Sequence, residues 1–119
     1  MCIRDRNYAI WYTDINEEED KYYGKTLKIK GRSLLGGGLD DDEFVIGRHI
    51  MTCCVEDIQF GGLVAKYDRA EELEHGGWVE MTAVVKKEFN HMYQSEGPVL
   101  YAVSVKQTEP PEEEVATFY

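Results

Sequence analysis

The sequence predicts an all-β domain in which five strands close into a Greek-key barrel, with one short helix between the third and fourth strands. Segments of apolar residues, several alternating with polar ones, recur along the chain and are separated by glycine-rich or acidic turns. A polar segment with helix start and stop signals follows the third of them. With 119 residues, of which 43% are hydrophobic, the chain is long enough for one domain with a single core.

The strands are predicted over residues 25–34, 44–55, 58–67, 78–89 and 98–107. The first alternates most clearly, because Leu27 and Lys28 begin a run in which apolar and basic residues take turns. Gly31 and Gly47 interrupt the first two strands, and glycine inside a strand marks a bend or a bulge. We therefore expect strongly coiled strands, as a small barrel requires.

The helix is predicted over residues 69–75, where Asp68 caps its start and Gly76 ends it. The element order is then three strands, one helix and two strands, which is the order of the oligonucleotide/oligosaccharide-binding (OB) fold. We expect the helix to plug one end of this OB-fold-like barrel. Closing the sheet removes exposed strand edges, which stabilises a domain of this size.

The segments outside the barrel are predicted from composition. Residues 1–6, Met-Cys-Ile-Arg-Asp-Arg, resemble a translated sequencing adapter, so we expect upstream sequence to be missing. Residues 8–15 have strand-forming composition, and residues 16–23 suit a short helical turn capped by Asn16. The predicted organisation is an adapter artefact over 1–6, a linker with a helical turn over 7–24, the barrel over 25–108 and an acidic, proline-containing tail over 109–119.

The charge balance disfavours nucleic acid as a partner. The chain has 13 basic and 23 acidic residues, a net charge of −10, whereas nucleic-acid affinity depends on clustered Lys and Arg. An OB-type nucleic-acid-binding module stays an alternative, and its basic patch would have to come from Lys28, Lys30, Lys86 and Lys87. An acidic surface instead suits cations or a basic protein partner.

The adjacent cysteines Cys53 and Cys54 allow two interpretations. Successive side chains of a strand point to opposite faces, so the two sulfurs cannot share one metal ion without a bulge. One interpretation is therefore a pair of small, buried structural residues. The other is a metal-binding or thiol-redox domain, because thiolates bind soft metals such as zinc or copper(I) and act as nucleophiles.

His49 is the third candidate metal ligand, because it shares a strand face with Met51 and Cys53. His49 and Cys53 would lie about 13 Å apart on one strand, so a site needs further ligands from a neighbouring segment. The acidic run at residues 40–43 lacks the spacing of a calcium-binding EF-hand loop and predicts a solvated turn. No catalytic triad or phosphate-binding loop stands out, so we expect no enzymatic activity.

Residues 44–48 (Phe-Val-Ile-Gly-Arg) and 51–58 (Met-Thr-Cys-Cys-Val-Glu-Asp-Ile) are the densest part of a recognisable pattern, which residues 97–102 support. Over residues 20–119, the chain resembles the C-terminal domain of an uncharacterised bacterial family of membrane proteins, which are predicted permease subunits. The Arg-x-x-Met-Thr-Cys-Cys-x-x-Asp run is its most specific part. The positions that it marks are Arg48, Cys53, Cys54 and Asp57.

This resemblance implies a non-enzymatic accessory domain that contacts a partner permease or its cargo. It implies transmembrane helices before the domain and a location at the cell membrane, and it carries over no catalytic residue. The present chain has no such span, which fits a truncated start. We further expect an ion pair between Arg48 and Asp57, and we expect Trp78 to seal the barrel where the helix meets the fourth strand.

Overall fold

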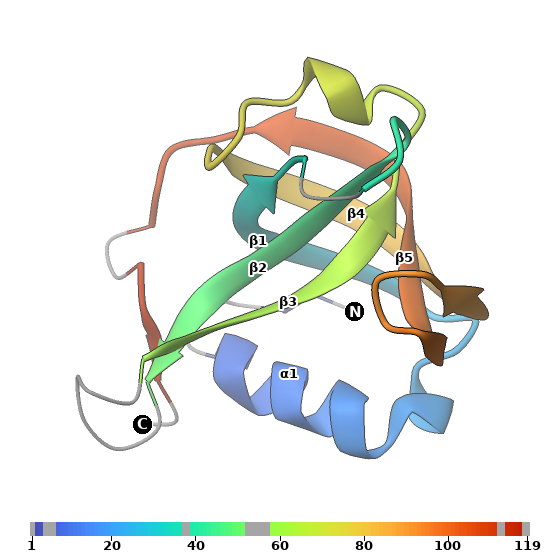
Figure 1. Cartoon of the computed structure of the whole chain (residues 1–119). Coiled ribbons are helices and arrows are strands. Elements are labelled where there is room, and N and C mark those ends of the chain that lie inside the picture. The colour runs from blue at the N-terminus through green and yellow to red at the C-terminus, as the bar shows by residue number, and fades with distance from the viewer. Residues whose placement is uncertain (1, 4–6, 37–38, 52–57, 112–113, 118–119) are drawn as a thin grey trace.

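The structure is a computed structural model that describes residues 2–3, 7–36, 39–51, 58–111 and 114–117. A six-stranded sheet has the order β1-β4-β5-β3-β2-β6, and β1 also pairs with β2, so the first five strands form a closed barrel (Figure 1). This confirms the predicted all-β, OB-like barrel. The elements are α1 (Tyr8–Glu17), β1 (Thr26–Leu34), β2 (Glu43–Met51), β3 (Gln59–Lys66), β4 (Trp78–Asn90), β5 (Ser95–Gln107), β6 (Ala116–Thr117) and the 3-10 turns η2 (Glu19–Lys21) and η4 (Ala70–Glu72).

The barrel closes because β1 pairs with β4 over residues 26–32 and with β2 over residues 32–34. Arg32 is opposite Trp78 of β4 and also opposite Gly47 of β2. The seam between β3 and β5 is much shorter, since only Ala65 and Lys66 pair with β5, in parallel register. The hydrophobic core lies inside the barrel, and all five barrel strands contribute to it. Its buried residues include Leu27, Phe44, Leu63, Met81 and Leu100.

Glycines allow the first three strands to approach closely. A Cβ atom placed on Gly47 would lie 2.4 Å from the carbonyl oxygen of Gly61, and one on Gly31 would lie 2.8 Å from the carbonyl oxygen of Gly47. No side chain fits at such distances from rigid backbone. The bends expected at Gly31 and Gly47 are therefore close backbone crossings that bring β1, β2 and β3 together.

Helix α1 closes one end of the barrel, below the strands in Figure 1. It buries Tyr8, Ala9, Trp11 and Ile15. The strand-like expectation for residues 8–15 is therefore wrong. These residues have β-favouring composition, but the buried positions 8, 11 and 15 follow the three- and four-residue spacing of a helix face. Asn16 does not cap a helix either: it lies in the last turn of α1, where its side-chain amide donates to the carbonyl oxygen of Tyr12 (2.7 Å).

The predicted helix over residues 69–75 is reduced to the single turn η4, at the end of the barrel opposite α1 (Figure 1). Ala70 of this turn is fully buried, and Leu73 packs against the core. Arg69 precedes the turn without a side-chain capping bond, so Asp68 does not play the predicted role.

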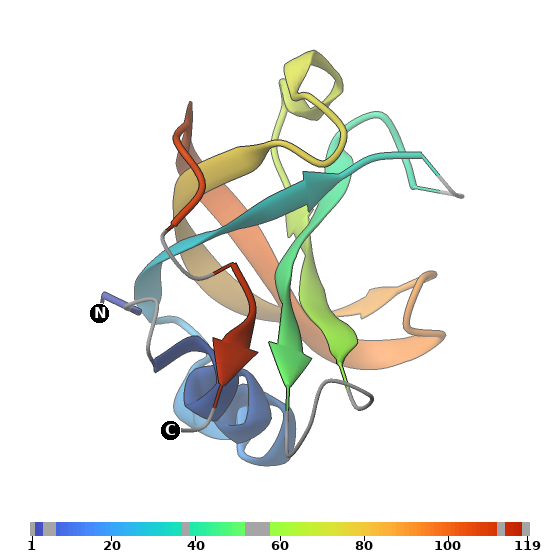
Figure 2. The ribbon, with the colours of Figure 1, turned by 90° about the vertical axis from the view of Figure 1, so that its left-hand side faces the viewer.

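The C-terminal segment returns to the barrel, where β6 pairs with β2 in parallel register (Figure 2). Ala116 lies opposite Ile50 and is buried. No helix within the described residues has the length and apolar character needed to cross a membrane.

Candidate functional site

Arg48 is the marked residue whose surroundings the structure describes most fully. It is 1% exposed and has the largest side chain among the fully buried residues. Its Nε donates to the carbonyl oxygen of Lys30 (2.8 Å), and its guanidinium carbon lies 5.6 Å from the ring centroid of Tyr8 and 5.2 Å from that of Trp78. The barrel interior thus holds a cation between two aromatic rings, an arrangement that the ring quadrupoles stabilise.

Trp78 joins Arg48 in this cluster. It begins β4, is 7% exposed and has a second cation, that of Arg32, 5.1 Å from its ring centroid. The other marked residues, Cys53, Cys54 and Asp57, lie outside the described residues. The ion pair between Arg48 and Asp57 and the roles of the two thiols therefore stay predictions.

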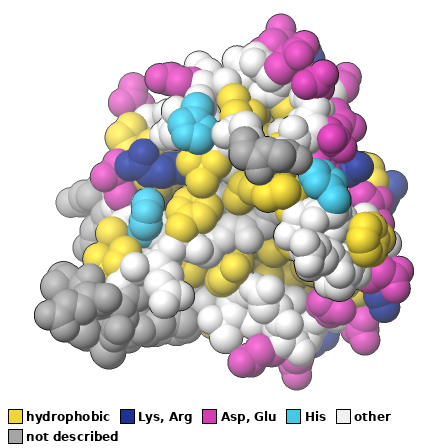
Figure 3. All heavy atoms as spheres, in the orientation of Figure 1, with side chains coloured by type: hydrophobic (Ala, Val, Ile, Leu, Met, Phe, Trp, Pro, Cys, Tyr) yellow, Lys and Arg dark blue, Asp and Glu magenta, His cyan; other side chains and the backbone are white. Residues whose placement is uncertain are grey.

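His49 lies apart from this cluster. Adjacent residues of a strand point to opposite faces, so Arg48 points into the barrel while His49 is exposed outside, with its ring 5.3 Å from that of Phe60. On the face of the barrel seen in Figure 3, hydrophobic side chains gather in the middle and acidic ones lie around the edge. A metal-ligand role for His49 with the two cysteines remains a prediction.

The lysines proposed for a basic patch are mostly engaged. Lys28 forms an ion pair with Glu80 (2.9 Å), Lys86 lies 4.7 Å from the ring centroid of Tyr101, and Lys87 lies 6.0 Å from that of Tyr23. These contacts direct the ammonium groups to neighbouring side chains of the protein. They therefore do not favour a continuous groove for a phosphate backbone.

A buried carboxylate fastens the β4–β5 turn to the start of β2. Glu43 is 2% exposed, and its Oε1 lies 2.7 Å from Nε2 of His91 and accepts from the backbone N–H of Asp40 (3.1 Å). Its Oε2 accepts from the side-chain amide of Asn90 (2.9 Å). Burial raises the pKa of Glu43, but the hydrogen bonds from His91, Asp40 and Asn90 outweigh it and hold the pKa below its ordinary value.

The same cluster is the one place among the described residues where three potential metal ligands converge. One ligand atom each from Asp40, Glu43 and His91 lies within 4.8 Å of the others. The Nε2 atom of His91 is 2.7 Å from Oε1 of Glu43 and 3.7 Å from Oδ2 of Asp40, so the imidazole already contacts both carboxylates. These contacts explain why the three side chains converge: they hold the loop before β2 against the turn between β4 and β5.

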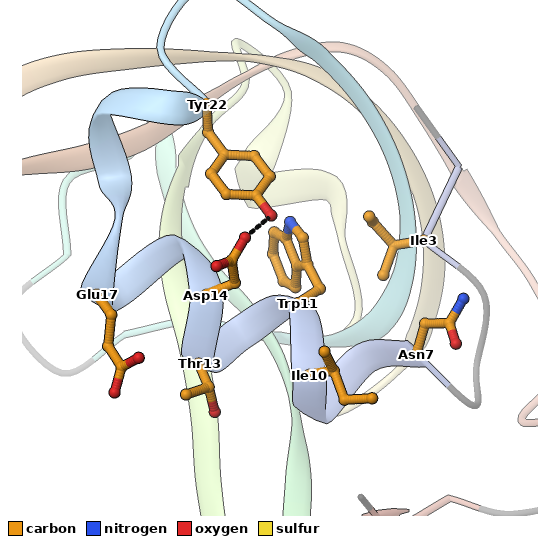
Figure 4. A pocket seen from close by; sticks show the side chains of 8 residues that line it. All are labelled: Ile3, Asn7, Ile10, Trp11, Thr13, Asp14, Glu17 and Tyr22. Carbon is orange, nitrogen blue, oxygen red and sulfur yellow. Dashed lines mark hydrogen bonds between the residues drawn. The ribbon is translucent and has the colours of Figure 1, made fainter.

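The outer side of α1 borders a cavity of about 470 Å³. Its lining combines apolar, aromatic and acidic side chains, and the close-up in Figure 4 shows them around Trp11. The lining residues are Ile3, Asn7, Ile10, Trp11, Thr13, Asp14, Glu17 and Tyr22. Ile10 is 54% exposed and lines this cavity together with Ile3, so this side of α1 has some apolar surface.

The acidic part of the cavity is organised around Asp14. The hydroxyl of Tyr22 donates to its Oδ2 (2.5 Å), and the ammonium group of Lys21 lies 3.1 Å away. The Tyr22 hydrogen bond and then the Lys21 contact hold the pKa of Asp14 below its ordinary value. Burial, with the Asp14 hydrogen bond, raises the pKa of Tyr22 to about 12, so the phenol stays a neutral donor at physiological pH.

A second hollow of about 580 Å³ adjoins the first and shares Glu17 with it. It is lined by the run from Asn16 to Lys21, which contains four consecutive acidic residues. Lys21 pairs with Asp14 and with Glu18 (2.7 Å), which offsets part of this negative charge. The outer surface of α1 and η2 therefore has an apolar part and an acidic part, which we call the α1 surface.

Comparison with known families matches residues 1–116 to the family described as DUF1980 C-terminal domain. The chain belongs to this family. No curated protein matches this DUF1980 domain. Among solved structures, one similar chain occurs in the structure of "OBody AM3L09 bound to hen egg-white lysozyme", with a TM-score of 0.48 and 9% identity over 73% of this chain and 84% of that chain.

The family match supports the resemblance to a family of unknown function that the sequence suggested. The matched range also includes residues 1–6, and their origin in an adapter stays a prediction. The α1 surface of this DUF1980 domain lies within residues 7–24, for which the sequence predicts a linker with a short helical turn. The signal that could have found it is the spacing of Tyr8, Trp11 and Ile15, which places large residues on one side of a helix and leaves Ile10 on another.

Proposed function

We propose that this DUF1980 domain is a non-enzymatic accessory domain of a membrane-associated permease subunit, and that it binds the partner permease through the α1 surface. One observation carries the proposal: Ile10, 54% exposed, lies beside an open cavity of about 470 Å³ at the end of the barrel that α1 closes. Contiguous exposed apolar surface marks interaction sites, and Ile3 lines the same cavity as Ile10. The permease as partner comes from the family resemblance.

The groups at this surface suit binding better than chemistry. Asp14 is held by Tyr22 and Lys21, and the remaining lining consists of aliphatic side chains, an indole, an amide, a hydroxyl and Glu17. A general base or a nucleophile needs a positioned partner within hydrogen-bond reach of the reacting atom. The α1 surface instead provides shape, apolar area and negative charge, which together specify a partner.

The test is co-purification of the full-length protein with its permease from membranes, comparing Ile10→Asp with Val103→Asp. Val103 is 66% exposed on β5, away from the α1 surface, so it is a matched control. We expect Ile10→Asp to reduce the recovered permease at least about tenfold, because a charge is desolvated in the interface, while Val103→Asp leaves recovery unchanged. Full recovery with Ile10→Asp would reject the α1 surface as the contact.

A further inference from the structure

We infer that Asp40, Glu43 and His91 form a binding site for a divalent metal ion of the zinc type, with water in the remaining coordination positions. The site lies between the loop before β2 and the turn between β4 and β5. It shares no residue with the α1 surface, so it does not depend on the proposed function. Three features carry the inference: the spacing of the ligand atoms, the way Glu43 is positioned, and the access from solvent.

The spacing of the three ligand atoms suits an ion held by one nitrogen and two oxygens. Nε2 of His91 lies 2.7 Å from Oε1 of Glu43 and 3.7 Å from Oδ2 of Asp40, and one ligand atom of each residue lies within 4.8 Å of the others. Zinc binds such atoms at about 2.0–2.2 Å, so two ligand atoms at a tetrahedral angle lie about 3.3–3.6 Å apart. The two distances from His91 lie on either side of this range, so small side-chain movements would bring both carboxylates onto one ion.

Glu43 is held in place by groups that are not themselves metal ligands. Its Oε2 accepts from the side-chain amide of Asn90 (2.9 Å), and the side-chain oxygen of Asn90 in turn accepts from the backbone N–H of Met92 (2.8 Å). These bonds leave Oε1 directed at His91. Metal-binding carboxylates are typically hydrogen-bonded in this way, which orients them before the ion arrives. The contacts that fasten the two loops therefore also prepare a ligand set.

The charges around the site favour a cation. The ammonium group of Lys66 lies 3.9 Å from Oε2 of Glu43, which is the oxygen bonded to Asn90, and 3.5 Å from Glu88, which offsets its charge. Asp40 adds a second carboxylate beside the imidazole. The net charge of −10 further attracts cations to the protein.

An ion can reach the ligands from solvent. The side chains of Asp40 and His91 are 68% and 44% exposed, whereas that of Glu43, at the base of the site, is 1% exposed. Three protein ligands leave at least one position for water, as in open zinc sites. A mixed set of one imidazole and two carboxylates suits zinc better than magnesium or calcium, which prefer oxygen ligands.

The experiment is a titration of the purified, EDTA-treated protein with Zn²⁺, followed by amide NMR spectra and thermal melts. We expect the signals of residues 40–43 and 90–93 to shift. The melting temperature should rise, since an ion that binds only the folded state stabilises it. Mg²⁺ at the same concentrations should produce neither effect. Zinc bound by cysteine thiolates would shift other signals, so the spectra separate the two kinds of site.

Asp40→Asn and His91→Gln are the test variants, because each removes one ligand. Asp40 is exposed, and a glutamine at position 91 can still donate to Glu43, so both variants should fold. We expect each to bind Zn²⁺ at least about tenfold more weakly, since even groups that only orient a metal ligand cost 10–100-fold when they are removed. Asp41→Asn and His75→Gln make the same substitutions at exposed positions outside the site and should bind like the unchanged protein.

Two results would overturn the inference. One is the absence of zinc-dependent shifts at residues 40–43 and 90–93 at millimolar Zn²⁺. The other is an affinity for zinc that Asp40→Asn and His91→Gln leave unchanged. If His91→Gln does not fold, the comparison of Asp40→Asn with Asp41→Asn decides. Neither result bears on the α1 surface, which the permease co-purification tests separately.

Discussion

Tyr8 of α1 donates its hydroxyl proton to the backbone carbonyl oxygen of Gly61 in β3, over a distance of 2.7 Å and a separation of 53 residues. The neighbouring Tyr12 reaches the carbonyl oxygen of Gly62 (3.5 Å), and Tyr93 accepts from the backbone N–H of Val64 (2.9 Å). Tyrosine hydroxyls thus bond to backbone groups of β3, whose pairing with β5 covers only Ala65 and Lys66. Tyr8 and Tyr12 thereby attach α1 to β3, while Tyr93 joins β3 to β5, because its hydroxyl also donates to the carbonyl oxygen of Pro98 (2.8 Å).

Replacing Tyr8 with Phe should therefore destabilise the domain. The change leaves the carbonyl oxygen of Gly61 buried without this donor, so we expect the free energy of unfolding to fall by about 1–3 kcal/mol. Tyr12→Phe is the matched control: its bond is 3.5 Å long, and its loss should cost less. Urea denaturation of both variants measures the difference in the free energy of unfolding. Equal losses would show that the bond to Gly61 stabilises the domain no more than the longer bond to Gly62.

Gly47→Ala should disrupt the barrel. The added Cβ would lie 2.4 Å from the carbonyl oxygen of Gly61 and 2.5 Å from the Cα atom of Gly62, and neither backbone atom can move aside alone. We expect a loss of about 3 kcal/mol or more in the free energy of unfolding, or failure to fold. Gly77→Ala, whose Cβ would lie 3.2 Å from the carbonyl oxygen of Glu74, should cost much less. Thermal melts measure both variants. Equal melting temperatures for Gly47→Ala and Gly77→Ala would contradict the close crossing of β2 and β3 at Gly47.

The Glu43 cluster should make stability depend on acid pH. Because the pKa of Glu43 in the folded state lies below its ordinary 4.5, the carboxylate stabilises the fold above that pH and loses this contribution as pH falls through its folded pKa. At pH 6, Glu43→Gln should therefore lower the free energy of unfolding by about 1–3 kcal/mol. The difference from the unchanged protein should shrink as pH falls below about 4.5.

The measurement is chemical denaturation of both proteins at several pH values between 6 and 3. Glu72→Gln is the control, because Glu72 is exposed and pairs only loosely with Arg69 (3.9 Å), so it should have little effect at any pH. A constant difference between Glu43→Gln and the unchanged protein across this range would mean that the folded-state pKa of Glu43 is not lowered.

The predicted ion pair between Arg48 and Asp57 is tested by a double-mutant cycle. Arg48→Met and Asp57→Asn should each lower the free energy of unfolding by about 3–5 kcal/mol, since each leaves the opposite charge buried without its counter-ion. The double variant should lose less than the sum of the two, because it leaves no such charge. Additive losses would show that the two side chains do not interact and that Arg48 depends on Lys30, Tyr8 and Trp78 instead.

The strands were predictable because their signals are local. The alternation that starts at Leu27 and Lys28 and the glycines that bound the segments placed β1, β3 and β4 within a residue or two of their positions in the structure. The loop expected over residues 90–97 is shorter, because β4 runs to Asn90 and β5 begins at Ser95, with Gln94 in the turn at a φ of 57°. Helix α1 was missed because Tyr8, Trp11 and Ile15 favour strands by residue type.

The amino-acid sequence by itself determined the five strands, the acidic surface and the class of barrel, because alternation, turn residues and charge act within a few residues of one another. Only the tertiary structure decided that Arg48 lies inside the barrel, that Glu43 meets His91 and that α1 closes one end over Gly61. These contacts join residues 18 to 53 positions apart in the chain. Such pairs depend on how the closed sheet brings the strands and the helix together, and the local pattern around any of them does not specify its partner.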